Sequence, residues 1–247
     1  MNKTGQELWV VMPIYNEEES IRRVLDEWLP MLRETIGNDK FVLAAINDGS
    51  KDRSLDILQD YARRYSELII IDKTNSGHGQ SCIYGYRIAL ENGVSWIFQM
   101  DSDGQCDPRF FPRFWELREK YPVIYGYRKK RDDGFGRYLM SRVVSLVTFL
   151  GAGVWVRDPN VPYRLMRAES LSPFIEGFPK DFHLANILLA ALQKKCFKIY
   201  WVDIHFRQRF GGVMSVKHFS FLKQGYKLLI QMLRAKKIIE TLTVDIK

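Results

Sequence analysis

The 247-residue sequence predicts an α/β fold with a mostly parallel, doubly wound sheet. In the first half of the chain, short apolar runs alternate with amphipathic segments that have helical spacing. Turns rich in glycine, asparagine and aspartate separate them. Repeated strand–helix units of this kind are joined by right-handed crossovers, which place successive strands parallel in one sheet.

The first half is expected to contain four strands, at residues 8–15, 41–47, 68–71 and 96–100. A helix over 18–34 follows the first strand and places five apolar side chains on one face. These are Ile21, Val24, Leu25, Trp28 and Leu32. A second helix is predicted from the N-cap Asp52 to about residue 65. A third runs from a glycine-bearing turn at 75–79 to about residue 92, with Gly93 just after its end.

The second half is less regular. It predicts helices over 108–121, 137–150 and 181–194, and strands over 123–127, 161–167 and 198–206. We expect one catalytic domain over 1–214, with a nucleotide-binding half (1–107) and an acceptor half (108–214). A basic, amphipathic helical tail over 215–247 completes the predicted organisation.

Composition limits the location and partners of the chain. The net charge of +8 favours anionic partners. Cys82, Cys106 and Cys196 have neither zinc nor redox spacing, so we expect reduced thiols in a cytosolic compartment. The apolar run at 8–15 is interrupted by Pro13 and does not predict a signal peptide. The longest apolar stretch, 143–156, is shorter than the roughly 20 residues of a bilayer span but long enough to lie in a membrane surface.

Three predicted strand ends carry polar motifs, at residues 13–17, 47–50 and 101–103. In a doubly wound sheet, the carboxyl ends of the first and fourth strands meet at the topological switch point, and ligands bind there. We therefore expect the three motifs to converge on one crevice. Tyr15 could stack on a base, and Asp48 could accept a hydrogen bond from a ring N–H. Asp101 and Asp103 could clamp a diphosphate through a divalent cation.

Four motifs in order give the chain a family resemblance: P-x-Y-N-E-E from Pro13, N-D-G-S-x-D from Asn47, N-x-G-x-G from Asn75 and D-x-D-x-Q from Asp101. Over about residues 8–215 the chain resembles the GT-A (Rossmann-like) glycosyltransferases of family 2. It is most similar to the branch of dolichyl-phosphate mannose synthases and bacterial polyprenyl-phosphate sugar transferases. The resemblance implies a UDP- or GDP-linked sugar donor, Mn²⁺ or Mg²⁺, inversion at the anomeric carbon and a polyprenyl phosphate acceptor.

The resemblance also implies roles for individual residues. The nucleotide-sugar site would comprise Pro13, Tyr15, Glu17, Asp48, Gly77, Gly79, Asp101, Gln105 and Arg137. Asp101, Asp103 and Gln105 would surround the metal, and Arg128 and Arg209 would be basic members of the catalytic set. Independently, glycines before a helix let backbone N–H groups approach a phosphate, which supports Gly77 and Gly79. Two departures are Asn47, which replaces an aspartate, and Ser215, which is displaced from the late arginine.

The catalytic base has two candidates. Asp181 lies where many GT-A enzymes place that carboxylate, and it could equally be the N-cap of the following helix. Asp158, before Pro159, is the second candidate. An acceptor phosphate is already an anion and needs no strong base. His78 is expected to be a loop residue, since no second histidine has ligand spacing.

The tail predicts a helix with one apolar face and many flanking basic residues. The apolar face comprises Phe219, Leu222, Tyr226, Leu229 and Leu233. This pattern is typical of an interfacial helix on anionic lipid, and equally of a helix packed on the body or on a second subunit. We expect a cytoplasmic protein, peripheral at the inner face of the cytoplasmic membrane, in which the tail could also form an oligomer.

The sequence supports the alternative functions unequally. Transfer to a sugar hydroxyl of a lipid-linked or surface glycan would use Asp181 as base. A nucleotidyltransferase is disfavoured because the loop after the first strand, residues 15–19, is acidic. A nucleic-acid partner is not expected, since the positive charge belongs to no RNA-binding motif. The non-enzymatic alternative is a degenerate nucleotide-sugar binding module.

Overall fold

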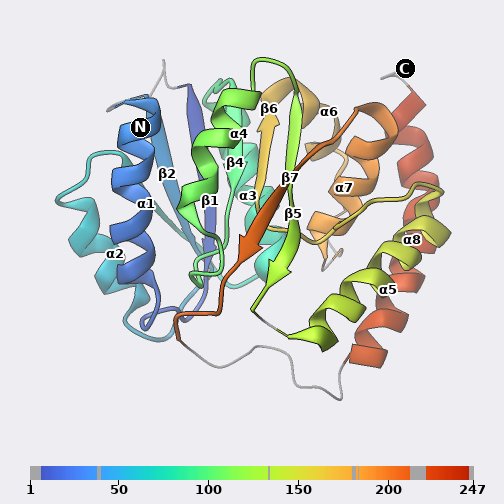
Figure 1. Ribbon diagram of the computed structural model, residues 1–247, viewed down its shortest axis with the longest axis horizontal. Coiled ribbons are helices and arrows are strands. Elements are labelled where there is room, and N and C mark those ends of the chain that lie inside the picture. The colour runs from blue at the N-terminus through green and yellow to red at the C-terminus, as the bar shows by residue number, and fades with distance from the viewer. Residues whose placement is uncertain are drawn as a thin grey trace.

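The computed structural model describes residues 7–37, 40–132, 134–179, 182, 184–211 and 221–244. Within them, seven strands form one sheet in the order β3-β2-β1-β4-β6-β5-β7. The strands are Leu8–Ile14 (β1), Phe41–Asn47 (β2), Leu68–Asp72 (β3), Trp96–Gln99 (β4), Val123–Arg131 (β5), Arg164–Arg167 (β6) and Tyr200–Phe206 (β7). Figure 1 shows the twisted sheet with helices on both faces.

The main helices are Ile21–Ile36 (α1), Ser54–Ala62 (α2), His78–Glu91 (α3), Phe111–Leu117 (α4), Phe135–Ala152 (α5), Ser172–Ile175 (α6), Ala185–Cys196 (α7) and Phe221–Val244 (α8). Two 3₁₀ turns, η1 (Pro108–Phe110) and η2 (Ala168–Ser170), precede α4 and α6. The predicted helix over 108–121 is therefore split and shorter. Asp52 lies one residue before the N-cap of α2, yet its carboxylate still accepts from the Ser54 N–H at 2.9 Å.

The sheet confirms the predicted fold class. β1 lies between β2 and β4 and runs parallel to both, and β2 pairs parallel with β3. β6 is antiparallel to both of its neighbours, β4 and β5, while β5 pairs parallel with β7. The sheet is continuous, so the predicted nucleotide-binding and acceptor halves share it; their boundaries stay a prediction.

The core surrounds the central strands. Every residue of β1 and β2 is buried, as expected for parallel strands covered on both faces. An aromatic cluster joins α1 to the sheet, with Trp28 against Phe98 and Tyr163 at centroid distances of 5.5 and 5.9 Å. Gly85 lets α3 approach β1, since a Cβ there would lie 2.5 Å from the Val11 side chain. This packing fixes the strand ends that carry the polar motifs.

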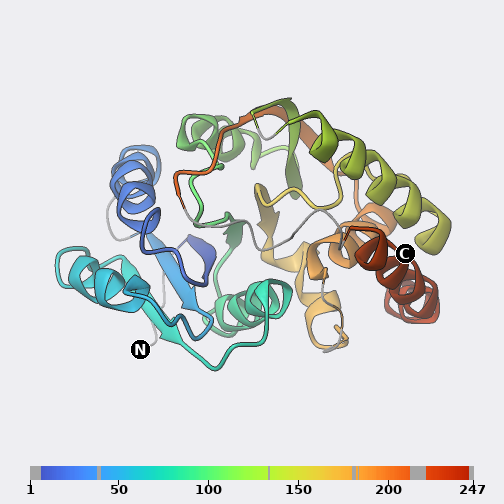
Figure 2. The ribbon, with the colours of Figure 1, turned by 90° about the horizontal axis from the view of Figure 1, so that it is seen from below.

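α8 packs along α5 and also contacts α7. Figure 2 shows α5 and α8 side by side at the opposite end of the molecule from α1 and α2. The buried side chains of α8 include Leu228, Met232, Ala235 and Ile239, whereas Leu233 of the predicted apolar face is exposed. Phe219 and the side chains of Leu222 and Tyr226 lie outside the described residues, so the predicted apolar face as a whole stays a prediction. No helix within the described residues is both long and apolar enough to cross a bilayer.

Candidate active site

The carboxyl ends of β1, β2 and β4 lie at one edge of the sheet, as the sequence predicts (Figure 2). Ile14 at the end of β1 pairs with Asn47 at the end of β2. The Ser102 hydroxyl, in the loop after β4, donates to the carbonyl oxygen of Pro13 at 2.9 Å. The three polar motifs therefore form one site.

The Asp48 carboxylate, after β2, is held by donors from the turn before α3. The backbone N–H groups of Ser76 and Gly77 each donate to it at 2.8 Å, and the Lys73 ammonium donates to it as well. Burial opposes ionisation, but the hydrogen bonds from Lys73 and Ser76 hold the pKa of Asp48 below its ordinary value. Gly77 has a φ of 88°, which favours glycine. The predicted base-binding carboxylate is thus fixed in position.

The loop after β1 presents the exposed ring of Tyr15. The next residue, Asn16, has a φ of 54°, and its N–H donates to the Ser50 hydroxyl at 3.0 Å. Its side-chain oxygen accepts from the Lys51 N–H at 2.8 Å. These bonds join the loop after β1 to the loop that carries Asp48. Stacking of Tyr15 on a base stays a prediction that this geometry permits.

The two aspartates after β4 have few donors. Oδ1 of Asp101 is buried and has no hydrogen-bond partner among the described residues, and Nε2 of His78 lies 3.6 Å from it. Oδ1 of Asp103 accepts from the Gln105 N–H at 3.0 Å. Burial raises the pKa of both aspartates; the negative charge of Asp103 adds to the shift at Asp101, and His78 opposes it. A cation would stabilise this pair.

The donor set fits a divalent cation that also takes phosphate oxygens. Among the described residues, no group of three or more His, Cys, Asp or Glu side chains is placed to hold a metal alone. Mg²⁺ is usually bound through one or two carboxylates plus substrate phosphates and water, so two aspartates suffice. The Gln105 amide nitrogen donates to the Arg207 carbonyl at 3.0 Å, so a metal contact from Gln105 would use its amide oxygen.

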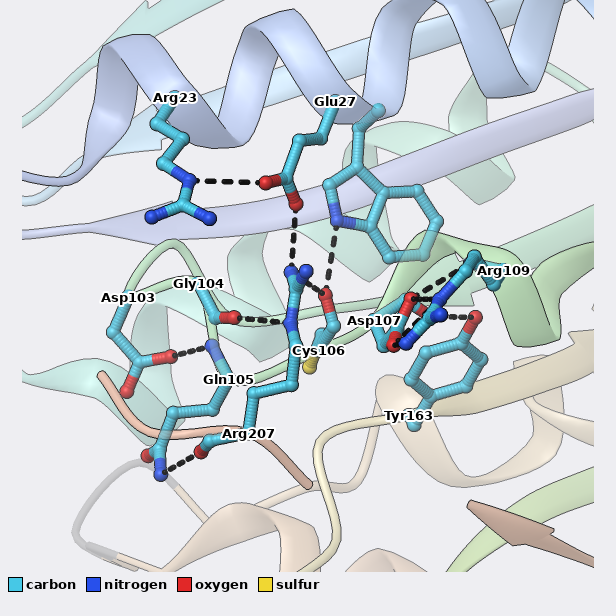
Figure 3. Close-up of polar contacts among 11 residues, drawn as sticks. Arg23, Glu27, Asp103, Gly104, Gln105, Cys106, Asp107, Arg109, Tyr163 and Arg207 are labelled. Atoms are coloured by element: carbon cyan, nitrogen blue, oxygen red, sulfur yellow. Dashed lines mark hydrogen bonds and ion pairs between the residues drawn. The ribbon is translucent and has the colours of Figure 1, made fainter. Parts of the chain in front are cut away.

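A strap formed by residues 207–211, after β7, crosses the Asp101–Gln105 loop (Figure 3). The Arg207 guanidinium donates to the Gly104 carbonyl at 3.1 Å and to Glu27 of α1 at 2.8 Å. The Phe210 N–H donates to the Asp103 carbonyl at 3.0 Å. A Cβ on Gly104 would lie 2.2 Å from the Phe210 ring, so only glycine permits this approach. The strap holds the loop that carries both aspartates.

Arg209 extends from this strap into the predicted site. Its guanidinium donates to Glu17, and its Nη1 lies 3.8 Å from Oδ2 of Asp103. Burial raises the pKa of Glu17, although Ser20 and Arg209 oppose that shift. The structure therefore brings the predicted residues Glu17, Asp103 and Arg209 together.

Arg128 and Asp158 form a buried ion pair between β5 and the loop before β6. The guanidinium donates to both carboxylate oxygens, at 2.8 and 2.6 Å. Burial opposes ionisation, but Arg128 holds the pKa of Asp158 below its ordinary value. A carboxylate engaged in this way is a weak proton acceptor, so the geometry favours a positioning role for Asp158 over that of base.

Of the remaining predicted residues, Arg137 and Gly79 lie within the described part of the chain, and Asp181 does not. Arg137 lies in the first turn of α5, and its charge is among those that oppose the rise in the pKa of Asp103, which burial causes. Gly79 is buried at the start of α3. Asp181 lies outside the described residues, so its role as base or N-cap stays open.

Sequence reasoning missed Arg207 and Glu27. Glu27 accepts from Arg23 at 3.1 Å and from Arg207 at 2.8 Å, which joins α1 to the strap (Figure 3). Arg207 stands two residues before Arg209, in a basic segment after a predicted strand, and that position was its only signal. No local pattern relates it to a glutamate 180 positions away.

Comparisons with known proteins identify the family of this chain. The family "Glycosyl transferase family 2" matches residues 9–178. An undecaprenyl-phosphate 4-deoxy-4-formamido-L-arabinose transferase of Pectobacterium carotovorum is 28% identical over 223 residues, which are 89% of this chain and 65% of that protein. The relative of the same description from Pseudomonas aeruginosa PAO1 is 30% identical over 64% of this chain and 46% of its own length. This chain thus spans less than two thirds of these relatives.

Solved structures share the fold. Glucosyl-3-phosphoglycerate synthase of Mycobacterium tuberculosis, in complex with Mn²⁺, UDP and phosphoglyceric acid, has a TM-score of 0.66 at 18% identity. The match covers 94% of this chain and 78% of that one. S. aureus TarS 1–349 in complex with UDP has a TM-score of 0.60 at 15% identity, covering 98% and 70%. The family match over most of the sequence shows that this chain belongs to glycosyl transferase family 2, and its fold is the GT-A fold that its motifs predict.

Proposed function

We propose that this protein is a metal-dependent, inverting glycosyltransferase that moves a sugar from a nucleoside-diphosphate sugar to polyprenyl phosphate at a membrane surface. The observation that carries the proposal is the partly buried pair Asp101 and Asp103, at the same sheet edge as Asp48 and the turn that binds it. The names of the related undecaprenyl-phosphate sugar transferases support the acceptor class.

The donor would lie across the ends of β1, β2 and β4. Tyr15 would stack on the base, and Asp48 would accept from a ring N–H, as either uracil or guanine can provide. The UDP complexes of the solved neighbours support a uridine donor. Gly77 and Gly79 would bring backbone N–H groups near the diphosphate, at the start of α3.

Asp101, Asp103 and the amide oxygen of Gln105 would hold Mn²⁺ or Mg²⁺. When bound, the cation neutralises the negative charge that develops on the departing nucleoside diphosphate. The Mn²⁺ in solved neighbours supports this assignment. Arg209, 3.8 Å from Asp103, would provide a further positive charge to the diphosphate.

A phosphate acceptor agrees with the described side chains. An oxygen of the acceptor phosphate would attack the anomeric carbon as the bond from that carbon to the diphosphate breaks, and no residue has to remove a proton. The paired state of Asp158 fits such a reaction. Arg128 and Arg137 would lie on the acceptor side, where a phosphate requires positive charge.

The exposed apolar face of α5 would contact the membrane. Its exposed side chains, with those of the loop after it, are Leu139, Val143, Leu146, Phe149, Leu150 and Trp155. Leu150 is 60% exposed. Lys129, Lys130 and Arg157 are exposed on neighbouring segments and would attract anionic lipid. A surface with both features fits the peripheral, inner-face location that the sequence predicts; oligomer formation through α8 stays a prediction.

The test is transfer of labelled sugar from a panel of UDP-, GDP- and dTDP-sugars, with Mn²⁺, into butanol-extractable polyprenyl phosphate. We expect label in the lipid phase from one donor, and none after EDTA. The control is Asp181→Asn, which should retain turnover if the acceptor is a phosphate.

Two results would change the proposal. Donor hydrolysis without lipid label, together with loss of turnover in Asp181→Asn, would move the acceptor to a glycan hydroxyl with Asp181 as base. Tight nucleotide-sugar binding with neither transfer nor hydrolysis would identify a degenerate binding module.

A further inference from the structure

A polar cavity of about 200 Å³ opens beside Asp101. Its walls come from four separate segments: His78 and Gly79 at the start of α3, Asp101 after β4, Asn160 in the loop before β6, and Asn186 in the first turn of α7. The cavity shares Asp101 with the proposed metal site. A group attached directly to a diphosphate bound there would reach into it.

The Asn186 side chain, which lines this cavity, has a buried acceptor without a donor in the part of the chain that the structure describes. It is 4% exposed, and its Oδ1 has no hydrogen-bond partner among the described residues. Oδ1 of Asp101, on another wall, is likewise buried and without such a partner. A buried acceptor without a donor is costly, so the Asn186 oxygen indicates an occupant that donates a hydrogen bond, while a bound cation would satisfy the oxygen of Asp101.

Arg164, which is fully buried in β6, binds two of the segments that line the cavity. Its guanidinium donates to the carbonyl of Pro159 at 2.6 Å, of Val161 at 2.7 Å and of Asn186 at 2.9 Å. One side chain thus fixes both the loop that carries Asn160 and the start of α7. The backbone at Asn186 is therefore held in place before any ligand arrives, as a discriminating pocket requires.

We propose that Asn186 is a specificity residue for the donor sugar, and that its amide pairs with a hydroxyl or amide N–H on the sugar ring. The proposal rests on the proposed function. A phosphate would offer mainly acceptor oxygens and would face the negative charge of Asp101. An acyl chain would leave the polar walls unsatisfied. The transferred sugar offers several donors and is attached directly to the metal-bound diphosphate.

The test compares Asn186→Leu with wild type by calorimetry in Mn²⁺, using UDP, GDP and the nucleotide sugar that wild type transfers. We expect Asn186→Leu to weaken binding of the nucleotide sugar at least about tenfold, while affinity for the bare nucleoside diphosphate stays unchanged. Donors lacking one ring hydroxyl identify the partner group. The analogue that costs wild type about tenfold should cost Asn186→Leu little, because the partner is already gone.

The matched control is Asn92→Leu. Oδ1 of Asn92 is also buried and without a partner among the described residues, but Asn92 is not part of the cavity wall. Asn92→Leu should leave the affinities for the nucleoside diphosphate and for the nucleotide sugar unchanged. Asn186→Ala, a smaller change, repeats the test if the leucine variant does not fold.

Three outcomes separate the explanations. Equal weakening of nucleotide and nucleotide sugar would make Asn186 merely structural and would overturn the proposal. Unchanged donor binding with a raised KM for polyprenyl phosphate would assign the cavity to the acceptor, and would also overturn it. Failure of wild type to bind any nucleoside diphosphate with Mn²⁺ would instead refute the proposed function.

Discussion

Two carboxylates at the same edge of the sheet differ in how many hydrogen-bond donors surround them. Asp48, after β2, receives hydrogen bonds from Lys73 and from the backbone N–H groups of Ser76 and Gly77. Asp101, after β4, has one buried oxygen without a partner among the described residues. Burial opposes the ionisation of both carboxylates. The hydrogen bonds to Asp48 outweigh that effect and lower its pKa, whereas burial raises the pKa of Asp101.

The two carboxylates therefore differ in whether the protein itself stabilises their negative charge. Donors from the protein stabilise Asp48, so its position does not depend on a ligand. Asp101 and Asp103 carry charge that the protein compensates poorly, and a cation bound with a diphosphate would supply the compensation. Substitutions at these carboxylates and at a third one test that contrast.

The largest effect is expected at a third carboxylate, Asp158, which is buried and paired with Arg128. Arg128→Met would leave a fully buried carboxylate without its cation, so we expect the free energy of unfolding to fall by about 3–5 kcal/mol. Urea denaturation measures it. The double variant Arg128→Met/Asp158→Asn should recover most of the loss. A loss below about 1 kcal/mol would mean that water or another group compensates Asp158.

Asp103→Ala should remove Mn²⁺-dependent binding of UDP and GDP and lower turnover at least about 100-fold, or about 2.7 kcal/mol. Calorimetry with and without Mn²⁺ measures the first effect. Asp203→Ala is the control, because Asp203 is an exposed carboxylate that pairs with Lys129 at 2.6 Å. Unchanged Mn²⁺-dependent affinity in Asp103→Ala would refute the metal assignment.

Asp48→Asn should destabilise the protein even without nucleotide or metal. The variant loses a charge-assisted acceptor for Lys73 and for two backbone N–H groups, so we expect a fall of about 1–3 kcal/mol in the free energy of unfolding. Equal stability of wild type and variant would show that the turn before α3 holds its shape without Asp48.

The pH dependence of that loss has a defined sign. The folded-state pKa of Asp48 lies below its unfolded value of about 3.9, so its contribution is fully present above that pH. The contribution is lost as the pH falls through the folded-state pKa. The advantage of wild type over Asp48→Asn, measured by urea denaturation, should therefore be constant near neutrality and shrink below about pH 4. An advantage that grows in acid would contradict this.

Asp101→Asn should have the smallest effect on stability, and in the opposite direction. Removing a poorly compensated, partly buried charge is expected to raise the free energy of unfolding by about 1 kcal/mol. Mn²⁺ with UDP or GDP should stabilise wild type in thermal unfolding and leave the variant unchanged. A clear destabilisation would mean that Asp101 is already satisfied, like Asp48.

Much of this arrangement follows from local sequence. The apolar runs of β1, β2 and β4 are continuous because both sheet faces are covered, so the strands are visible in the sequence. The convergence of residues 13–17, 47–50 and 101–103 follows from the parallel order of those strands. The predicted ends of the helices and strands were less accurate than the elements themselves. β6 begins at Arg164, after Pro159 and Val161 turn their carbonyls toward its guanidinium.

Strand periodicity and motif order are local properties, so the sequence was enough to predict the fold class and the family and to propose the carboxylates of the site. How each carboxylate is compensated depends on the tertiary structure. Lys73 reaches Asp48 from 25 positions away, Arg128 pairs with Asp158 across 30, and Arg207 reaches Glu27 across 180. That the oxygens of Asp101 and Asn186 find no partner among the described residues is likewise a property of packing. Whether a buried polar atom has a partner depends on which segments meet in space, and spacing along the chain does not encode that.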